Sequence, residues 1–243
     1  MRGTWIIFQR EVTQYFTSPV AYLIAFALLL LTGLLFNNDL VVSIGFKPPQ
    51  PALVPSFLSF ALILFAPLLT MRLLAEESRE GTLELLLTAP VRDSDIVFGK
   101  FLSAWFYYSL LLAVTFFAYQ AILNSITFPD MAHTMGAYIG IWLYGGATLA
   151  VGLMFSSMTE NQIVAAFMST VTLLFLWLGD LVGQVVSNIE LARIVRNLTL
   201  QGHFSASFAV GLVRAEDIAY YAGMIVVMLF ITIRLVESRR WRG

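Results

Sequence analysis

The sequence predicts an all-α, polytopic membrane protein with six transmembrane helices, an N-terminal interfacial amphipathic helix and an outer helical hairpin before the last span. Of its 243 residues, 59% are hydrophobic and 12% are charged, whereas soluble domains are roughly half apolar and a quarter charged. A bilayer core requires about 20 apolar residues per helix, and the chain contains runs near that length. These runs do not alternate apolar and polar residues, which argues against a transmembrane β-barrel.

The predicted spans are separated by polar or proline-containing segments, and the whole chain, 1–243, is interpreted as one transmembrane domain. The spans are residues 20–36, 52–71, 96–123, 135–155, 163–178 and 218–235. Pro19 precedes the first span, where its missing N–H is harmless. Pro67 lies inside the second span and predicts either a kink or a loosened helix. Lys100 is close enough to the start of the third span for its ammonium group to reach the membrane surface.

The distribution of basic residues predicts the orientation. Arginine and lysine concentrate on the cytosolic side of multi-pass membrane proteins. With both termini cytosolic, the inside holds Arg2, Arg10, Arg72, Arg79, Arg92, Lys100, Arg234, Arg239, Arg240 and Arg242, and the outside holds Lys47, Arg193, Arg196 and Arg214. We therefore expect a multi-pass protein of the prokaryotic cytoplasmic membrane with cytosolic termini.

The segment before the first span, residues 4–17, is predicted to be a helix that lies in the cytosolic interface plane. Its apolar residues recur at helical spacing, with polar residues on the other face; the apolar set is Trp5, Phe8, Val12, Tyr15 and Phe16. The alternative is an N-terminal extension of the first span.

Two further segments are predicted to lie outside the membrane. Residues 187–216 are too polar to span and are expected to form two short helices on the outer side, with a break at Gln201-Gly202-His203. Residues 37–51 are expected to be a loop, because the prolines near their end disfavour a helix.

Several function classes lack the residues they require. The net charge of -1 argues against a nucleic-acid partner, and the absence of cysteine excludes thiolate metal sites and thiol catalysis. His133 and His203 have no metal-ligand spacing, so no metal site is expected. Ionisable residues are almost absent from the spans, which argues against an ion-coupled transporter. Because neither a Gly-x-Ser-x-Gly elbow nor a phosphate-binding loop occurs, we expect no catalytic residue and no cofactor in this chain.

Glycines recur at four-residue spacing in two places, Gly136-x-x-x-Gly140 and Gly179-x-x-x-Gly183. Such spacing permits close contact between helices. Packing inside the bundle is favoured over a dimer face.

The densest run of charge extends from Glu76 to Glu84, in the predicted cytosolic segment 72–95. A Leu-rich stretch follows and ends at Pro90. A solvated turn with a short helix on the membrane surface would explain this pattern. The combination of acidic charge, Gly81-Thr82 and four leucines that need cover instead favours docking in the groove of a partner.

This pattern, Glu-Glu-x-x-x-Gly-Thr-x-Glu-x-Leu-Leu followed by Pro90-Val91 and Gly99-Lys100, closely resembles the cytosolic loop of the type-2 ABC exporter (ABC-2) permeases. The resemblance covers nearly the whole chain. It is strongest to the gliding-motility and nitrous-oxide-reductase-maturation type of permease, on His203-Phe204, Tyr220-Tyr221 and the closing Glu237-Ser238-Arg239-Arg240-Trp241.

The resemblance implies a permease subunit of an ATP-driven exporter. It would pair with a second permease chain, commonly an identical one, and with two cytosolic ABC ATPase subunits that bind ATP and Mg; an auxiliary extracytoplasmic or membrane protein is a further expected partner. The implied coupling residues are Glu76, Glu77, Arg79, Glu80, Gly81, Thr82 and Glu84, and the implied secondary contact is Thr159 and Glu160. Two alternatives remain: a membrane anchor that transmits force or signal without moving a solute, and, less favoured, an enzyme, either an intramembrane hydrolase or a lipid-modifying protein.

Overall fold

The computed structural model describes residues 2–43, 50–82, 91–126, 130–185, 190 and 198–240, and within these ranges every regular element is a helix. The helices are α1 (Arg2–Thr17), α2 (Pro19–Ser43), α3 (Leu53–Thr70), α4 (Arg72–Arg79), α6 (Asp93–Ile126), α7 (Met131–Met158), α8 (Gln162–Val185), α10 (Leu200–Ala206), the 3-10 turn η1 (Phe208–Val210) and α11 (Ala215–Arg240). Among the described residues, six helical segments are long and apolar enough to cross a membrane: α2, α3 continued into α4, α6, α7, α8 and α11. The predicted all-α, six-span fold class is thereby confirmed.

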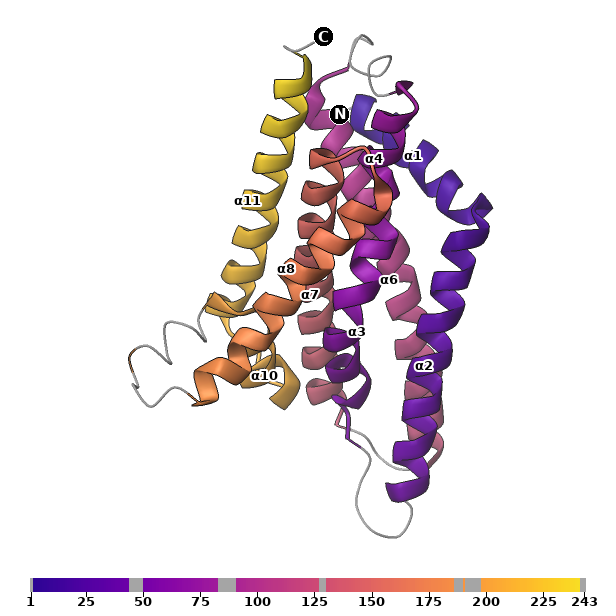
Figure 1. The fold of residues 1–243 in the computed structure, drawn as a ribbon. Helices are drawn as coiled ribbons and strands as arrows, with labels where there is room; N and C mark the ends of the chain where they lie inside the picture. Colours follow the sequence, from indigo (N-terminus) through magenta and orange to yellow (C-terminus); the bar gives the residue numbers. More distant parts are fainter. Residues whose placement is uncertain are drawn as a thin grey trace.

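The long helices form a bundle with both chain ends at one end of it (Figure 1). Helices α1 and α4 lie at that same end, and α10 lies toward the other end. An even number of spans requires this arrangement, because each span reverses the side of the membrane on which the chain emerges.

Helix α7 is the centre of the bundle and contacts α3, α6, α8 and α11. Its glycines make these approaches close: a Cβ at Gly145 would overlap the ring of Tyr108 in α6, one at Gly152 would overlap the Thr70 side chain, and one at Gly140 would overlap Phe208. Small residues let transmembrane helices approach in this way. Packing inside the bundle, predicted for the Gly136-x-x-x-Gly140 pair, is confirmed; the surroundings of Gly183 lie outside the described side chains.

Helix α1 is separate from α2 and meets it at a bend that Figure 1 shows clearly. Ser18 lies between the two helices and Pro19 begins the second. Proline carries no N–H, so it cannot donate to the carbonyl four residues earlier, and the helix bends there. Helix α1 then packs along the first turns of α6.

The face that α1 buries differs from the predicted apolar stripe. Its buried side chains are Ile7, Glu11 and Tyr15, whereas Trp5 is 59% exposed. These three residues are spaced by four and share one face. The stripe that α1 buries thus has a carboxylate at its centre, while Trp5 and Phe16 of the predicted apolar set stay exposed on the protein surface.

Two other segments depart from their predicted form. Helix α2 continues to Ser43, so the expected loop from residue 37 begins later, and residues 44–49 lie outside the described structure. Of the outer segment 187–216, residues 187–189 and 191–197 also lie outside it. The expected break at Gln201-Gly202-His203 is absent: α10 runs through it, because the Thr199 hydroxyl accepts a hydrogen bond from Gly202 N at 3.2 Å and starts the helix just before.

Candidate coupling site

The charged segment predicted to couple to a partner is helical in its first half. Met71 keeps right-handed helical backbone angles, so α4 follows α3 almost without interruption. The helix ends where Gly81 adopts a φ of 71°, a left-handed conformation that glycine tolerates at a helix C-terminus. Thr82 Oγ1 then donates to the carbonyl of Glu77 at 3.3 Å. The Gly81-Thr82 pair therefore terminates α4 and turns the chain.

Four charged side chains from three helices meet beside α4, and we call Arg10, Glu11, Glu77 and Lys100 the buried ion cluster. Lys100 Nζ lies 2.9 Å from Glu11 Oε1 and 2.9 Å from Glu77 Oε1. Arg10 Nη2 lies 2.7 Å from Glu11 Oε1 and 2.6 Å from Glu77 Oε1. Each carboxylate thus pairs with both cations, and α1, α4 and α6 are joined at one point.

Burial makes this cluster different from a surface ion pair. The Lys100 and Glu11 side chains are 1% and 3% exposed, and Glu77 is 16% exposed. Burial raises the pKa of the Glu11 carboxyl, but the Lys100 ammonium and the Arg10 guanidinium outweigh it and hold that pKa below its ordinary value. The Lys100 ammonium is therefore held inside the protein by two carboxylates, which the sequence alone had not indicated.

The start of α4 is fixed to α7 by one hydroxyl. Ser156 Oγ accepts hydrogen bonds from Leu74 N and Ala75 N, each at 3.1 Å, and donates to Met71 O at 2.9 Å. Ser156 thereby gives backbone groups at the junction of α3 and α4 a side-chain partner from α7.

Arg72 fixes the same junction to the bend between α1 and α2. Its Nη1 donates to Ser18 Oγ at 2.6 Å, and its guanidinium lies 5.2 Å from the centroid of the Tyr15 ring. Tyr15 in turn donates its hydroxyl to Leu69 O at 2.7 Å.

The far end of α4 is open. Arg79, Glu80, Gly81 and Thr82 are exposed, and we call these four residues the exposed end of α4. Arg79 lines a cavity of about 450 Å³ together with Glu160 and Asn161 of the turn between α7 and α8 and with Gln162, the first residue of α8. That turn has a defined shape, since Asn161 Oδ1 accepts from Ile163 N at 2.9 Å and Thr159 Oγ1 accepts from Asn161 N at 3.1 Å. Two segments far apart in sequence, both predicted to contact a partner, thus share one surface.

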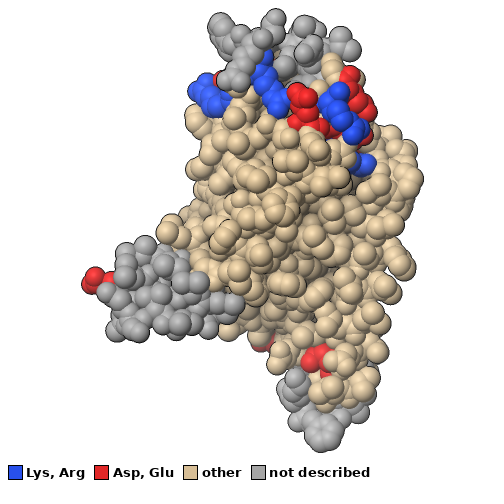
Figure 2. Space-filling view, in the orientation of Figure 1, with Lys and Arg blue, Asp and Glu red and all other residues tan. Residues whose placement is uncertain are grey.

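Basic and acidic side chains gather at this end of the molecule in the face that Figure 2 shows, and the tan middle of that face carries neither. Helix α11 contributes to the same end, because Arg239 donates a hydrogen bond from Nη1 to Ser78 Oγ in α4.

The predicted coupling residues divide into two groups. Glu77 points inward and forms ion pairs within the buried ion cluster. Glu76 lines a polar cavity of about 430 Å³ with Arg10 and Lys100. The exposed end of α4 and the exposed Glu160 face outward, with Thr159 half-buried beside them. Glu84 and the Leu-rich stretch lie outside the described residues.

Sequence reasoning missed three residues that fix α4: Glu11, Ser156 and Arg239. A signal existed for the first, because a lone Lys100 at the start of an apolar helix and a lone Glu11 at the centre of a helix stripe each need a partner of opposite charge. No comparable signal marks Ser156 or Arg239, since their partners lie in distant parts of the chain.

Comparison with known proteins agrees with this architecture. A search of curated proteins found no match. The model of the family described as ABC-2 family transporter protein matches residues 6–239. This match includes α4, the α7–α8 turn and the full length of all six candidate spans. It covers most of the chain, and the protein therefore belongs to the ABC-2 family of transporter membrane components.

Proposed function

We propose that this chain is the permease subunit of an ATP-driven exporter, and that the exposed end of α4 docks on a separate ABC ATPase subunit. ATP and Mg would be bound by that subunit. Two permease chains, most simply identical, would assemble with two ATPase subunits, and both termini would be cytosolic. The gliding-motility and nitrous-oxide-reductase-maturation type of permease is the subtype that we favour, on the sequence motifs given above.

The observation that carries this proposal is the shared surface of Arg79 and Glu160. A docking partner needs exposed, charged groups on a defined backbone, and the capped α7–α8 turn and the Gly81-terminated α4 both supply them. Residues that line one cavity can be engaged by one partner.

The buried ion cluster supports the second half of the proposal, which is transmission. A partner that moves α4 moves Glu77, and Glu77 is bound to Arg10 of α1 and Lys100 of α6. A closed ATPase dimer can shift the membrane helices only if contacts at α4 differ in strength between its open and closed states. Because the cluster connects α4 to α1 and α6, a change in the contacts between α4 and the ATPase can also move those two helices.

Charge reversal at the exposed end tests docking. The permease is co-expressed with a candidate ABC ATPase subunit, and copurification and ATP turnover in detergent are measured for Arg79→Glu, Glu80→Lys and Glu160→Lys. We expect each variant to fold normally and to lose ATPase binding. The matched control is Glu216→Lys, whose side chain is 72% exposed and lies at the start of α11, far from α4 in sequence.

Unchanged copurification and ATP turnover in all three variants would contradict the docking surface. ATP-dependent movement of a solute into or out of reconstituted vesicles then separates an exporter from the alternative, a membrane anchor that transmits force without transport. Intact ATPase coupling with no transport of lipid, peptide or glycan substrates would favour the anchor.

A further inference from the structure

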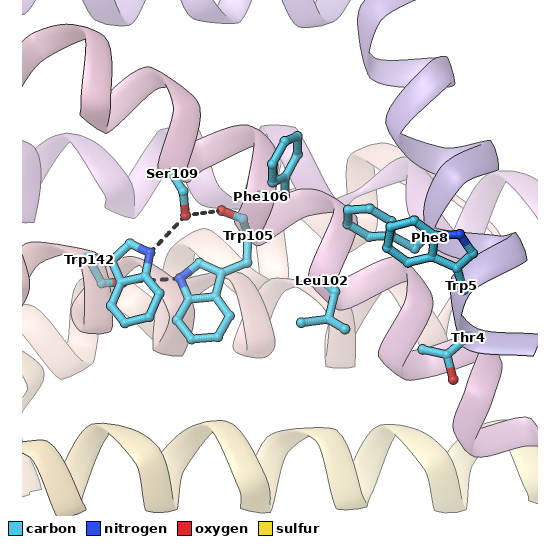
Figure 3. A pocket seen from close by; sticks show the side chains of 8 residues that line it. All are labelled: Thr4, Trp5, Phe8, Leu102, Trp105, Phe106, Ser109 and Trp142. Carbon is cyan, nitrogen blue, oxygen red and sulfur yellow. Dashed lines mark hydrogen bonds between the residues drawn. The ribbon is translucent and has the colours of Figure 1, made fainter. Parts of the chain in front are cut away.

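An apolar groove lies beside α1, on a part of the molecule separate from the coupling site. Its wall is one face of α6, formed by Leu102, Trp105, Phe106 and Ser109, which are spaced by three and four residues. Trp142 of α7 closes one end, and Trp5 and Phe8 of α1 close the other (Figure 3). The groove has a volume of about 560 Å³, which lies within the range of small-molecule sites, about 300–1,000 Å³.

Stacked aromatic pairs hold both ends of this groove in shape. The Trp105 and Trp142 rings stack with centroids 4.4 Å apart, and the Trp5 and Phe8 rings stack at 5.3 Å. Phe8 also meets Phe106 edge to face at 5.7 Å. Helix α1 therefore forms one wall of a defined cavity and also contributes Arg10 and Glu11 to the buried ion cluster.

The polar groups deep in the groove already have partners. Trp105 Nε1 donates to Trp142 O at 3.3 Å, Trp142 Nε1 donates to Ser109 Oγ at 2.8 Å, and Ser109 Oγ donates to Trp105 O at 2.6 Å. Figure 3 shows that this hydrogen-bonded network lies at the Trp142 end. A polar ligand would find no free donor there, whereas hydrocarbon would meet only ring faces and aliphatic carbon.

The Trp5 end is different. Trp5 is 59% exposed, and among the described residues its indole N–H has no hydrogen-bond acceptor. Its neighbour Thr4 donates to Asp95 at 2.5 Å, which places this end beside the first turn of α6. Tryptophan at a membrane surface commonly keeps its ring in the apolar region and its N–H toward polar groups.

The groove also has a direction. Leu102 and Ser109 are seven positions apart on α6, or about 10 Å of helix rise, and the direction from Leu102 to Ser109 leads away from the end that carries both chain termini. An elongated ligand would thus have its polar part near Trp5, at the membrane surface, and its apolar part near Trp142, deeper in the bilayer. This is the orientation of a lipid in the leaflet on the side of the two termini.

We propose that this groove binds one acyl chain of a bilayer phospholipid, as a resident ligand that holds α1 against α6 and α7. The ester or phosphate oxygens of the lipid accept from the Trp5 indole, and the chain lies along Leu102 and Phe106 toward the tryptophan stack. The inference does not depend on the proposed coupling of α4 to an ATPase.

Quenching of tryptophan fluorescence by a phospholipid with brominated acyl chains tests this site. Three of the five tryptophans, Trp5, Trp105 and Trp142, line the groove, and Trp177→Phe with Trp241→Phe removes the remaining signals. In delipidated protein in detergent, we expect quenching to saturate at one lipid per chain. Quenching that only rises in proportion to the lipid content of the micelle would overturn the proposal.

A groove-filling variant gives a second, independent readout. Leu102→Trp places a large ring in the groove, and Leu110→Trp is the control on the same helix, because Leu110 is 40% exposed against 39% for Leu102 and does not line the groove. Native mass spectrometry should show that Leu102→Trp loses one retained phospholipid per chain and that the control keeps it. Equal retention in both variants would contradict the site.

Two other occupants would also overturn the proposal. If the ligand were transported cargo, the retained lipid would leave when the ATPase and ATP are added. If a second copy of the chain filled the groove about a twofold axis that brings the two Leu102 positions together, Leu102→Cys would form an intermolecular disulfide, which is easily detected because the native chain has no cysteine. If Leu102→Trp fails to fold, the quenching titration decides alone.

Discussion

Replacing Lys100 with methionine should destabilise this protein more than any substitution of an exposed charge. The Lys100 side chain is 1% exposed, and its ammonium group is the partner of two carboxylates, Glu11 and Glu77. Methionine keeps most of the side-chain volume but leaves Glu11, itself 3% exposed, with Arg10 as its one remaining cation in the cluster. The loss of a buried charge partner therefore outweighs the small change in packing.

The size of the effect follows from this burial. Breaking a buried ion pair costs about 3–5 kcal/mol, which for a chain of this length corresponds to a Tm lower by about 6–20 °C. Because Arg10 remains and is 40% exposed, we expect the lower part of that range. The assay is thermal unfolding of the purified protein in detergent, with Arg92→Met as the exposed control.

A double-mutant cycle with Glu11→Gln isolates the pairing from general damage. Once Glu11 is neutral, removing the Lys100 charge should cost less, so the double variant should be more stable than the sum of the single effects predicts. A coupling energy within about 0.5 kcal/mol of zero, the scatter seen for independent sites, would refute the assignment of Lys100 to a shared buried cluster. An unchanged Tm for Lys100→Met would refute it more directly.

Three further outcomes are expected from unfolding measurements. Ser156→Ala should lower the free energy of unfolding by about 1–3 kcal/mol because Leu74 N and Ala75 N lose their buried acceptor. The control Ser157→Ala removes a bond to Met154 O in the same helix and should lower it clearly less. Equal effects would contradict the anchoring of α4 by Ser156. Gly145→Ala should lower the free energy of unfolding by about 1–3 kcal/mol, because the new methyl group overlaps the Tyr108 ring. Gly223→Ala should be neutral or stabilising, because no neighbouring side chain lies within 4 Å of the new methyl group. The reverse order would contradict the packing of α6 on α7. Because neighbouring cations lower the pKa of Glu11 in the folded state, its stabilising contribution is present above the unfolded-state pKa and is lost as the pH falls through the folded-state pKa; Glu11→Gln should therefore flatten the acid side of the Tm profile, and an unaltered acid slope would exclude that contribution.

Most of the fold could be predicted from local patterns in the sequence. Continuous apolar runs predicted helices at the six spans, and Pro19 predicted where a helix begins, because each of these signals acts within a few residues of its own position. The glycines of α7 could also be assigned to internal packing, although nothing in the sequence identified Tyr108 or Thr70 as the side chains that occupy the space they leave.

The contacts that anchor the candidate site were much less predictable. Lys100 and Glu11 are separated by 89 residues, and Leu74 and Ser156 by 82. Such pairings depend on which helix faces meet, and no short-range pattern in the sequence indicates which faces those are. The same holds for the buried face of α1, where Glu11 at the centre of the stripe is paired with Lys100 on α6.

The way α4 is anchored suggests which movements it can transmit. Separate polar contacts connect it to α1 and α6 through Glu77, to α7 through Ser156, and to α11 through Ser78. Coupling between distant sites is typically about 1–3 kcal/mol, whereas breaking a buried ion pair such as those at Glu77 costs about 3–5 kcal/mol. A partner that docks on the exposed end of α4 would therefore displace α1 and α6 together with α4 before it could detach Glu77 from them. The hydrogen bond between Ser78 and Arg239 is the weakest of these connections, because Ser156 acts together with the buried Leu74 and Ala75 where α4 packs on α7. Relative movement should therefore occur first against α11. This order can be tested with distance probes on α4 paired to each helix: if α4 separates from α6 while its distance to α11 stays fixed during ATP turnover, the buried ion cluster is not the path of transmission.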